Sequence, residues 1–282
     1  MTILVTGGNG QLGCALRLAS AESRHRYIFT DIEELDITSS TAIEAFFNRE
    51  KVDVVVNCAA YTAVDLAEEN EAKADEINHK AVALLAKACK QHNATLIHIS
   101  TDYIFSGNAD KPYNENAEPA PLNAYGRTKL AGERAIAESG CKSIVLRTSW
   151  LYSEFGRNFV KTMRNLTATR SEIRVVADQI GTPTYASDLA KAITYIIESG
   201  QSEKVGVYHY SNMGECSWYD FAVEIARLSG NLGCKINPCT TADYPTKANR
   251  PRYSVLDKSK IIATFNLTIP KWKESLSKVV KR

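Results

Sequence analysis

The sequence lacks any long hydrophobic run and any strong charge bias. No apolar stretch approaches the roughly 18 residues that a membrane-spanning helix needs, so we expect no membrane partner. Acidic and basic residues nearly balance over 282 residues, with a net charge of +2. This balance does not favour nucleic acid as a partner. The opening "MTILVTGG" has neither the basic nor the long apolar part of a signal peptide, so we expect no secretory leader.

The cysteines show no motif spacing. There are seven of them, an odd number, and no zinc or redox pattern connects them. Several stand among apolar residues, as in "VVVNCAA" and "LLAKACK", where a reduced cysteine acts as a small buried hydrophobe. We therefore predict a cytoplasmic protein without disulfides and without a metal site.

The first half of the chain alternates apolar bursts with helical patterns. This alternation predicts βαβ units and a Rossmann-type, doubly wound parallel sheet. Strands are expected at residues 2–6, 26–31, 52–60, 95–101 and 142–152, and helices at 11–22, 40–50, 77–93 and 128–139.

The regular alternation of strand and helix patterns changes after Trp150. We expect a helix in 156–171, a strand, a proline turn and a helix in 173–199 with Asp188 near the start of the helix, a strand at 205–212, a helix at 217–230 and a loop at 237–253. We predict a dinucleotide-binding domain over 1–150 and a smaller α+β substrate-binding region over 151–282. The helix and strand near 187–211 are expected to return to the first domain.

Three glycines stand between the first predicted strand and helix. "VTGGNGQLGCAL" places Gly7, Gly10 and Gly13 in a G-x-x-G-x-x-G spacing. Glycine lets the backbone approach a pyrophosphate, whose charge the N–H groups of a helix start can hold. A plain strand-to-helix turn is the alternative.

Asp31 follows the second predicted strand, 18 residues after Gly13. A carboxylate there can bind the adenosine ribose hydroxyls and would repel a 2′-phosphate, which favours NADH. Arg24 and Arg26 lie nearby and keep NADPH open. The alternative role is a helix cap or a turn residue.

"NAYGRTKLAGE" places Tyr125 and Lys129 four residues apart, on one face of a helix. A nearby lysine cation lowers a tyrosine pKa, so Tyr125 can serve as general acid to a carbonyl that receives a hydride. "STDYIFSG" follows the fourth strand, where the Thr101 hydroxyl can polarise that carbonyl. An exposed helix face, and turn roles for Thr101 and Asp102, are the alternatives.

Taken together, these motifs resemble the extended short-chain dehydrogenase/reductase superfamily, and more narrowly the dTDP-4-dehydrorhamnose reductase family. The resemblance runs from residue 7 to about residue 260. It rests on "GGNGQLG", "NCAAYTAVDLAE", "STDYIFSG", "NAYGRTKLAGE", "LRTSWLYSEFGRNFV", "DQIGTPTYASDLA", "GECSWYDFA" and "RPRYSVLDKSK".

The resemblance implies a set of site residues. Thr101, Tyr125 and Lys129 would be catalytic, and Asp102 and Trp150 would contact the sugar. The dinucleotide would be lined by Gly7, Gly10, Gln11, Leu12, Gly13, Asp31, Asp36, Ile37, Ala59, Ala60, Tyr61, Tyr125 and Lys129. Arg250 would lie near the diphosphate, which a guanidinium pairs with well. On residue type alone, Arg250 can be a solvated loop residue and Trp150 a core residue.

One position departs from the family pattern. Some members carry a magnesium-binding glutamate at a dimer contact, where this chain has Ala15. A hydrocarbon side chain cannot ligate a hard cation. A homodimer stays open, but we predict that it is not of the magnesium-bridged type.

The resulting hypothesis is the reduction of the C4 ketone of dTDP-4-dehydro-L-rhamnose to dTDP-L-rhamnose by NADPH or NADH. A nucleotide-sugar epimerase is the nearest rival, and a non-catalytic nucleotide-binding regulatory subunit is a rival from another class.

Overall fold

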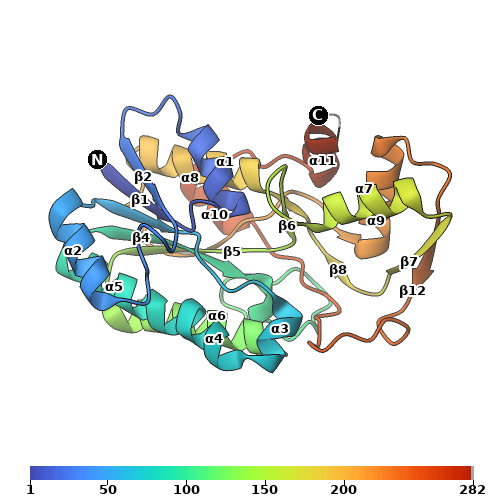
Figure 1. Cartoon of the computed structure of the whole chain (residues 1–282), viewed down its shortest axis with the longest axis horizontal. Helices are drawn as coiled ribbons and strands as arrows, with labels where there is room; N and C mark the ends of the chain where they lie inside the picture. Colours follow the sequence, from blue (N-terminus) through green and yellow to red (C-terminus); the bar gives the residue numbers. More distant parts are fainter. Residues whose placement is uncertain (281–282) are drawn as a thin grey trace.

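The computed structural model describes residues 1–280 and centres on a six-stranded sheet in which every strand pairing is parallel (Figure 1). In spatial order the sheet runs β10 (Gly206–His209), β5 (Ser143–Thr148), β4 (Thr95–Thr101), β3 (Val54–Asn57), β1 (Thr2–Thr6) and β2 (Arg26–Thr30). Most residues of these strands are buried because helices cover both faces of the sheet. The order reverses at β1, and β1 and β3 therefore flank the topological switch point.

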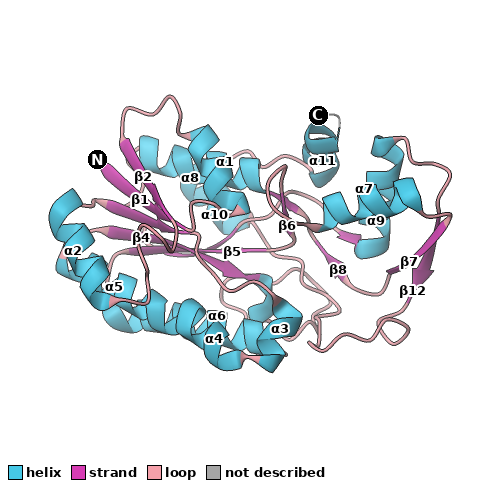
Figure 2. Ribbon diagram, in the orientation of Figure 1, coloured by secondary structure: helices cyan, strands magenta, loops and turns pink. Residues whose placement is uncertain are grey.

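Helices form a layer on each face of this sheet (Figure 2). One layer holds α1 (Gln11–Ala19), α8 (Ala186–Glu198) and α10 (Ser259–Phe265). The other holds α2 (Ser40–Glu50), α5 (Ala81–Gln91) and α6 (Ala124–Ser139). Three short segments lead into α5, namely α3 (Val64–Glu69), α4 (Glu71–Asp75) and the π-helical turn η1 (Glu76–Lys80), and the 3₁₀ turn η2 (Asp102–Ile104) follows β4.

A smaller second part lies beyond the carboxyl ends of the strands, at the right of Figure 1. Its core contains α7 (Phe159–Thr169), α9 (Trp218–Ser229) and α11 (Trp272–Val280). Three two-stranded pairings complete it: β7 (Glu172–Val176) with β12 (Lys235–Cys239), β8 (Ile180–Gly181) with β11 (Cys216–Ser217), and β6 (Leu151–Tyr152) with β9 (Thr184–Tyr185).

The prediction of a Rossmann-type parallel sheet with a smaller α+β region is confirmed, and β10 pairs with β5 in the large sheet. The prediction of a loop across 237–253 is wrong at its start, since β12 runs through Pro238 to Cys239. A proline fits there because β12 is an edge strand, where one missing N–H costs no ladder bond. The segment 64–75, for which no element was expected, forms α3 and α4.

No helix within the described residues is long and apolar enough to cross a membrane.

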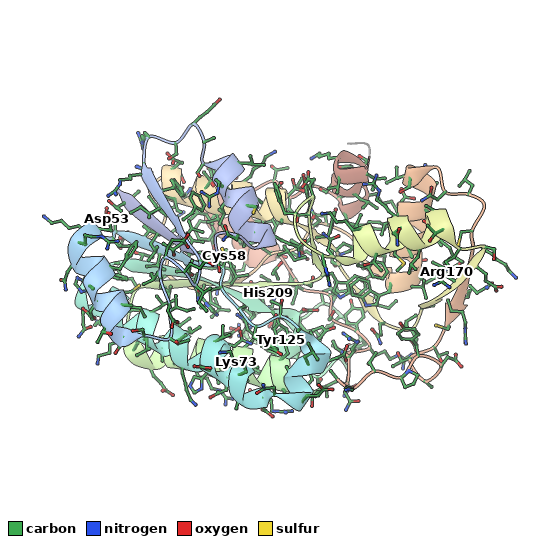
Figure 3. The ribbon with its side chains drawn as sticks, in the orientation of Figure 1. Asp53, Cys58, Lys73, Tyr125, Arg170 and His209 are labelled. Carbon is green, nitrogen blue, oxygen red and sulfur yellow. The ribbon has the colours of Figure 1, made fainter. Side chains whose placement is uncertain are left out.

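Figure 3 shows Tyr125 and Cys58 near the middle of the molecule, between the sheet and the second part. The carboxyl ends of the strands therefore face the second part, and the predicted site residues lie along this boundary.

Candidate active site

The glycine turn is closely packed. Gly7 has a φ of +64°, and a Cβ on it would lie 2.6 Å from the Ala59 nitrogen. A Cβ on Gly13 would lie 2.4 Å from the Gly7 carbonyl oxygen. Gly10 caps α1 without a side-chain bond, so the first amides of α1 keep their N–H groups directed out of the helix start. This backbone tolerates no side chain, as a pyrophosphate cradle requires.

The two predicted residues that follow Gly10 differ in their surroundings. Leu12 is buried in the core under α1. The Gln11 Oε1 atom accepts hydrogen bonds from the Ser153 hydroxyl at 3.0 Å and the Asn158 amide at 2.9 Å. Gln11 therefore connects the start of α1 to the start of α7.

Asp31 lies beside the glycine turn. Its carboxylate accepts the backbone N–H of Asn9 at 3.0 Å and that of Ile32 at 2.9 Å. The turn role left open from the sequence is therefore present, and it places the carboxylate next to the predicted cofactor cradle.

Asp36 and Ile37 make only local and core contacts. The Asp36 carboxylate accepts the backbone N–H and the hydroxyl of Thr38, and these two bonds lower its pKa. The Ile37 side chain is buried in the core between the sheet, α2 and α5. Within the described residues, no hydrogen bond joins either side chain to the glycine turn.

The loop after β3 is held by Asn78. The Asn78 amide accepts the backbone N–H of Tyr61 at 2.8 Å and donates to the Tyr61 carbonyl at 3.1 Å. It also donates to the Thr128 hydroxyl of α6 at 3.2 Å. Ala59, Ala60 and Tyr61 are thereby fixed beside the glycine turn, and each of them is partly exposed.

The Thr101 and Tyr125 side chains come together at the end of β4. The Thr101 hydroxyl lies close enough to the Tyr125 phenol to lower its pKa. It donates to Asp102 at 3.1 Å and accepts the Tyr103 N–H at 3.2 Å. The Tyr103 ring packs edge-on against the Tyr125 ring with centroids 5.7 Å apart. The structure thus places together two of the three residues that the motifs predict to be catalytic.

The start of α6 fixes the position of Tyr125. Asn123 caps the helix by accepting the Gly126 N–H at 2.8 Å. A Cβ on Gly126 would lie 2.2 Å from the Tyr103 carbonyl oxygen, so only glycine lets α6 approach η2 this closely.

The Lys129 amine points into the protein, with 1% of the residue exposed. It donates to the Ile99 carbonyl at 2.6 Å and lies 3.3 Å from His98 Nε2. Burial lowers the pKa of Lys129 to about 8, although the Glu133 carboxylate opposes this shift.

This geometry corrects one expectation. We expected Lys129 to lower the pKa of Tyr125. Burial instead raises the Tyr125 pKa, the Thr101 hydrogen bond lowers it in part, and Lys129 is not among the groups that act on it. The reason is geometric, since the amine is bonded to β4.

Asp102 is a buried carboxyl beside Thr101, with 2% of the residue exposed. Burial raises its pKa to about 7, while hydroxyls of Ser254 and Thr101 act in the opposite direction. A protonated Asp102 is therefore accessible near neutral pH.

A cavity of about 730 Å³ lies between α3 and the second part. Arg250 lines it, pairs with the Asp65 carboxylate at 2.5 Å and donates to the Tyr103 hydroxyl at 3.3 Å. Lys247 and Glu69 form a second ion pair on the same wall. Arg250 thus connects the cavity to the Tyr103–Tyr125 ring pair.

Trp150 lies beside the cavity rather than in its lining. Its ring is stacked on Trp218, which lines the cavity, at 3.6 Å between centroids. A Cβ on Gly181 would come within 2.6 Å of the Trp150 ring. The packing role left open from the sequence is therefore present at the edge of the site.

Sequence reasoning missed several residues of the site: Asn57, Asp65, Asn78, His98, Tyr103, Trp218 and Lys247. Four of them, Asn57, Asp65, Tyr103 and Trp218, stand within the quoted motifs, so those motifs already contained a signal. His98 stands between Ile97 and Ile99 in a strand that is mostly buried, so nothing in its local sequence marked it as a site residue.

Known proteins match this sequence over nearly its full length. The sequence model of the family described as "RmlD substrate binding domain" matches residues 1–282. A dTDP-4-dehydrorhamnose reductase of Aggregatibacter actinomycetemcomitans is 40% identical, with 98% of this chain and 97% of that protein covered.

Solved structures agree with this match. A dTDP-4-dehydrorhamnose reductase of Clostridium acetobutylicum superposes with a TM-score of 0.95 at 44% identity, covering 100% of this chain and 99% of that one. The enzyme of Bacillus anthracis, solved in complex with NADP, gives a TM-score of 0.94 at 38% identity, with 99% and 98% covered. The chain therefore belongs to the family of the RmlD substrate binding domain.

Proposed function

We propose that this protein is a dTDP-4-dehydrorhamnose reductase, which reduces the C4 ketone of dTDP-4-dehydro-L-rhamnose with NADPH or NADH. The observation that carries the proposal is the Thr101–Tyr125 hydroxyl pair at the end of β4, between the glycine turn and the cavity. The names of relatives of about 40% identity over nearly the whole chain support the same reaction.

The glycine turn fits a dinucleotide. Side chains are excluded at Gly7 and Gly13, and the free amides at the start of α1 suit a pyrophosphate. Asp31 and the Ala59–Tyr61 loop would hold the rest of the cofactor. The nicotinamide, when bound, supplies the hydride.

In this reaction Tyr125 gives the proton to the sugar oxygen. Burial keeps its phenol protonated, which is the form that a donor needs. The Thr101 hydroxyl would orient the same oxygen, and that hydroxyl donates to Asp102 at 3.1 Å. Lys129 would bind the cofactor ribose once its amine leaves the Ile99 carbonyl.

The cavity suits a nucleotide sugar. It contains basic groups for a diphosphate (Arg250, Arg174 and Lys247) and aromatic rings for a base or a sugar (Trp218, Tyr244 and Phe159).

We propose that residues 1–150 with 187–211 bind the dinucleotide and that the rest binds the sugar nucleotide. We also propose a cytoplasmic place of action, which accords with the seven free cysteines.

The direct test mixes the purified protein with the dTDP-keto-sugar and either NADPH or NADH. Nicotinamide absorbance should fall and dTDP-L-rhamnose should appear. Absence of turnover with both cofactors, in protein shown to be folded, would refute the reductase. Tightly bound NAD⁺ and sugar conversion without added reductant would instead establish the epimerase.

A further inference from the structure

A row of polar side chains crosses the sheet interior and ends at Lys129. The strand register aligns Thr6 of β1 with Asn57 of β3, and Asn57 with His98 of β4. The Thr6 hydroxyl donates to Asn57 Oδ1 at 2.7 Å, Asn57 Nδ2 lies 3.1 Å from His98 Nδ1, and His98 Nε2 lies 3.3 Å from the Lys129 amine. All four residues are at most 1% exposed, so water does not supply alternative partners.

One backbone N–H group fixes the orientation of the Asn57 side-chain amide in this row. The Ala59 N–H lies 3.2 Å from Asn57 Oδ1, and a backbone N–H can only donate. The Asn57 amide therefore keeps its oxygen toward Ala59 and its NH₂ group toward His98. The opposite orientation would set two donors against each other.

The direction of Asn57 determines the tautomer of His98. Because the Asn57 NH₂ group donates to Nδ1, His98 carries its proton on Nε2, which faces Lys129. Burial holds the His98 pKa far below its usual value, so the ring is neutral. An Nε2–H group needs an acceptor, and an ammonium group has none.

We propose that His98 is a positioning residue that donates its Nε2–H to an uncharged Lys129 amine, with Asn57 setting the tautomer. The Lys129 amine then accepts from His98 and donates to the Ile99 carbonyl, so that each contact joins a donor to an acceptor. A charged Lys129 would require Nδ1–H on His98, opposite the NH₂ group of Asn57.

The other groups around Lys129 do not require it to be charged. Glu133, on the same helix, favours the charged form but is bound by Arg147 at 2.7 Å, which satisfies the carboxylate. Cys58, after β3, remains a thiol because burial raises its pKa to about 12. The pKa of Lys129 is lowered to about 8, so the uncharged amine is the main form above that pH.

This inference rests on the proposed function only for its catalytic meaning. An uncharged Lys129 cannot stabilise a phenolate on Tyr125. The His98 contact therefore belongs to the uncharged form of Lys129 and not to a form that assists Tyr125.

The test reads the His98 tautomer directly by two-bond ¹H–¹⁵N NMR of the five histidines in the protein without added ligand. A His98→Gln variant assigns the signal. At a pH above about 8, where Lys129 is mostly uncharged, we expect the Nε2–H pattern in the wild type, whereas the Nδ1–H pattern there would overturn the proposal. The Asn57→Asp variant replaces the donor with an acceptor, so it should switch His98 to Nδ1–H. The exposed Asn165→Asp variant should leave the wild-type pattern.

A second measurement follows the Lys129 side chain by ¹³C NMR of labelled lysines, with Lys129→Arg for assignment. Lys129 should lose its proton as the pH rises through about 8, and Asn57→Asp should shift this step upward. A Lys129 that stays charged above pH 10 would overturn the proposal. Neither measurement needs turnover, so the failure of the reductase assay would remain a separate result.

Discussion

At the scale of single residues, the site places polar groups where water cannot reach them. Thr101, Asp102 and Lys129 are each at most 5% exposed. In such surroundings a hydrogen bond or a charge has a larger effect than at the surface, and an unmatched group is costly. The chemistry of each side chain is then set by its one or two neighbours.

Tyr125→Phe removes only the phenol oxygen. If Tyr125 is the proton donor, kcat should fall about 10²–10⁴-fold, the range typical of general acid catalysis. KM for both substrates should change little, since the ring contact with Tyr103 is kept. Steady-state kinetics measure both values, and an unchanged kcat would remove Tyr125 from the acid role.

Asp102 makes the free energy of unfolding depend on pH. Its pKa is raised from 3.8 to about 7 in the folded protein, so the folded state binds a proton that the unfolded state releases between these values. The stability supplied by this group is complete below about pH 4 and is lost as the pH rises to about 7, by at most about 4 kcal/mol.

Asp102→Asn lacks this titration. The variant should therefore gain stability relative to the wild type as the pH rises from 4 to 8, which urea unfolding at several pH values can measure. The exposed Asp110→Asn variant is the matched control and should show a pH-independent difference. A pH-independent difference for Asp102→Asn would contradict the raised pKa.

Residue identity and spacing were enough to predict where Gly7, Thr101 and Tyr125 lie, because each stands at a strand end or on a helix start. They were not enough for Lys129. Helical spacing predicted that its amine would act on Tyr125, but its length lets it reach β4, where Ile99 and His98 hold it. That choice depends on a cross-strand register which no local pattern reports.

At the scale of elements, α6 connects the site to the fold. It carries Tyr125 and Lys129, and its first turn touches η2 through Gly126. A change in the spacing between α6 and η2 would move the Thr101 and Tyr125 hydroxyls apart, even though neither residue is altered.

Gly126→Ala tests this contact. The added Cβ would lie 2.2 Å from the Tyr103 carbonyl oxygen, so α6 must shift. We expect a loss of stability of about 1–3 kcal/mol from overpacking, and a fall in kcat that exceeds any change in KM for NADPH. Gly233→Ala, where the Cβ meets nothing within 4 Å, is the control for thermal unfolding and kinetics.

Most elements followed from periodicity, since α2 spans the predicted 40–50 and α9 lies within the predicted 217–230. The failures have a physical cause. β12 forms because β7 offers a partner 63 residues earlier in the chain, from Lys235 to Glu172. Its own composition, with proline and asparagine, favours a loop.

At the scale of the whole molecule, ion pairs join α3 to the loop that contains Lys247 and Arg250. Asp65 binds Arg250, and Glu69 binds Lys247, on one wall of the cavity. Arg250 therefore already has an anionic partner, and a diphosphate would have to share or replace it.

Arg250→Ala should raise KM for the nucleotide sugar about 10–100-fold, because a guanidinium–phosphate contact is lost. KM for NADPH should stay within about twofold, since Arg250 lines the cavity and not the glycine turn. The neighbouring Arg252→Ala, an exposed residue, is the matched control. Equal effects on both substrates would place Arg250 elsewhere in the mechanism.

The Gln11 side chain has a consequence for how the two binding regions communicate. Its Oε1 atom accepts hydrogen bonds from Ser153 and Asn158, so this one side chain links the start of α1 to the start of α7. A ligand that stabilises the position of the glycine turn should therefore also stabilise the position of the second part. Thermodynamic linkage makes this coupling reciprocal. We expect dTDP to tighten NADPH binding in calorimetry, and Gln11→Ala to abolish that cooperativity.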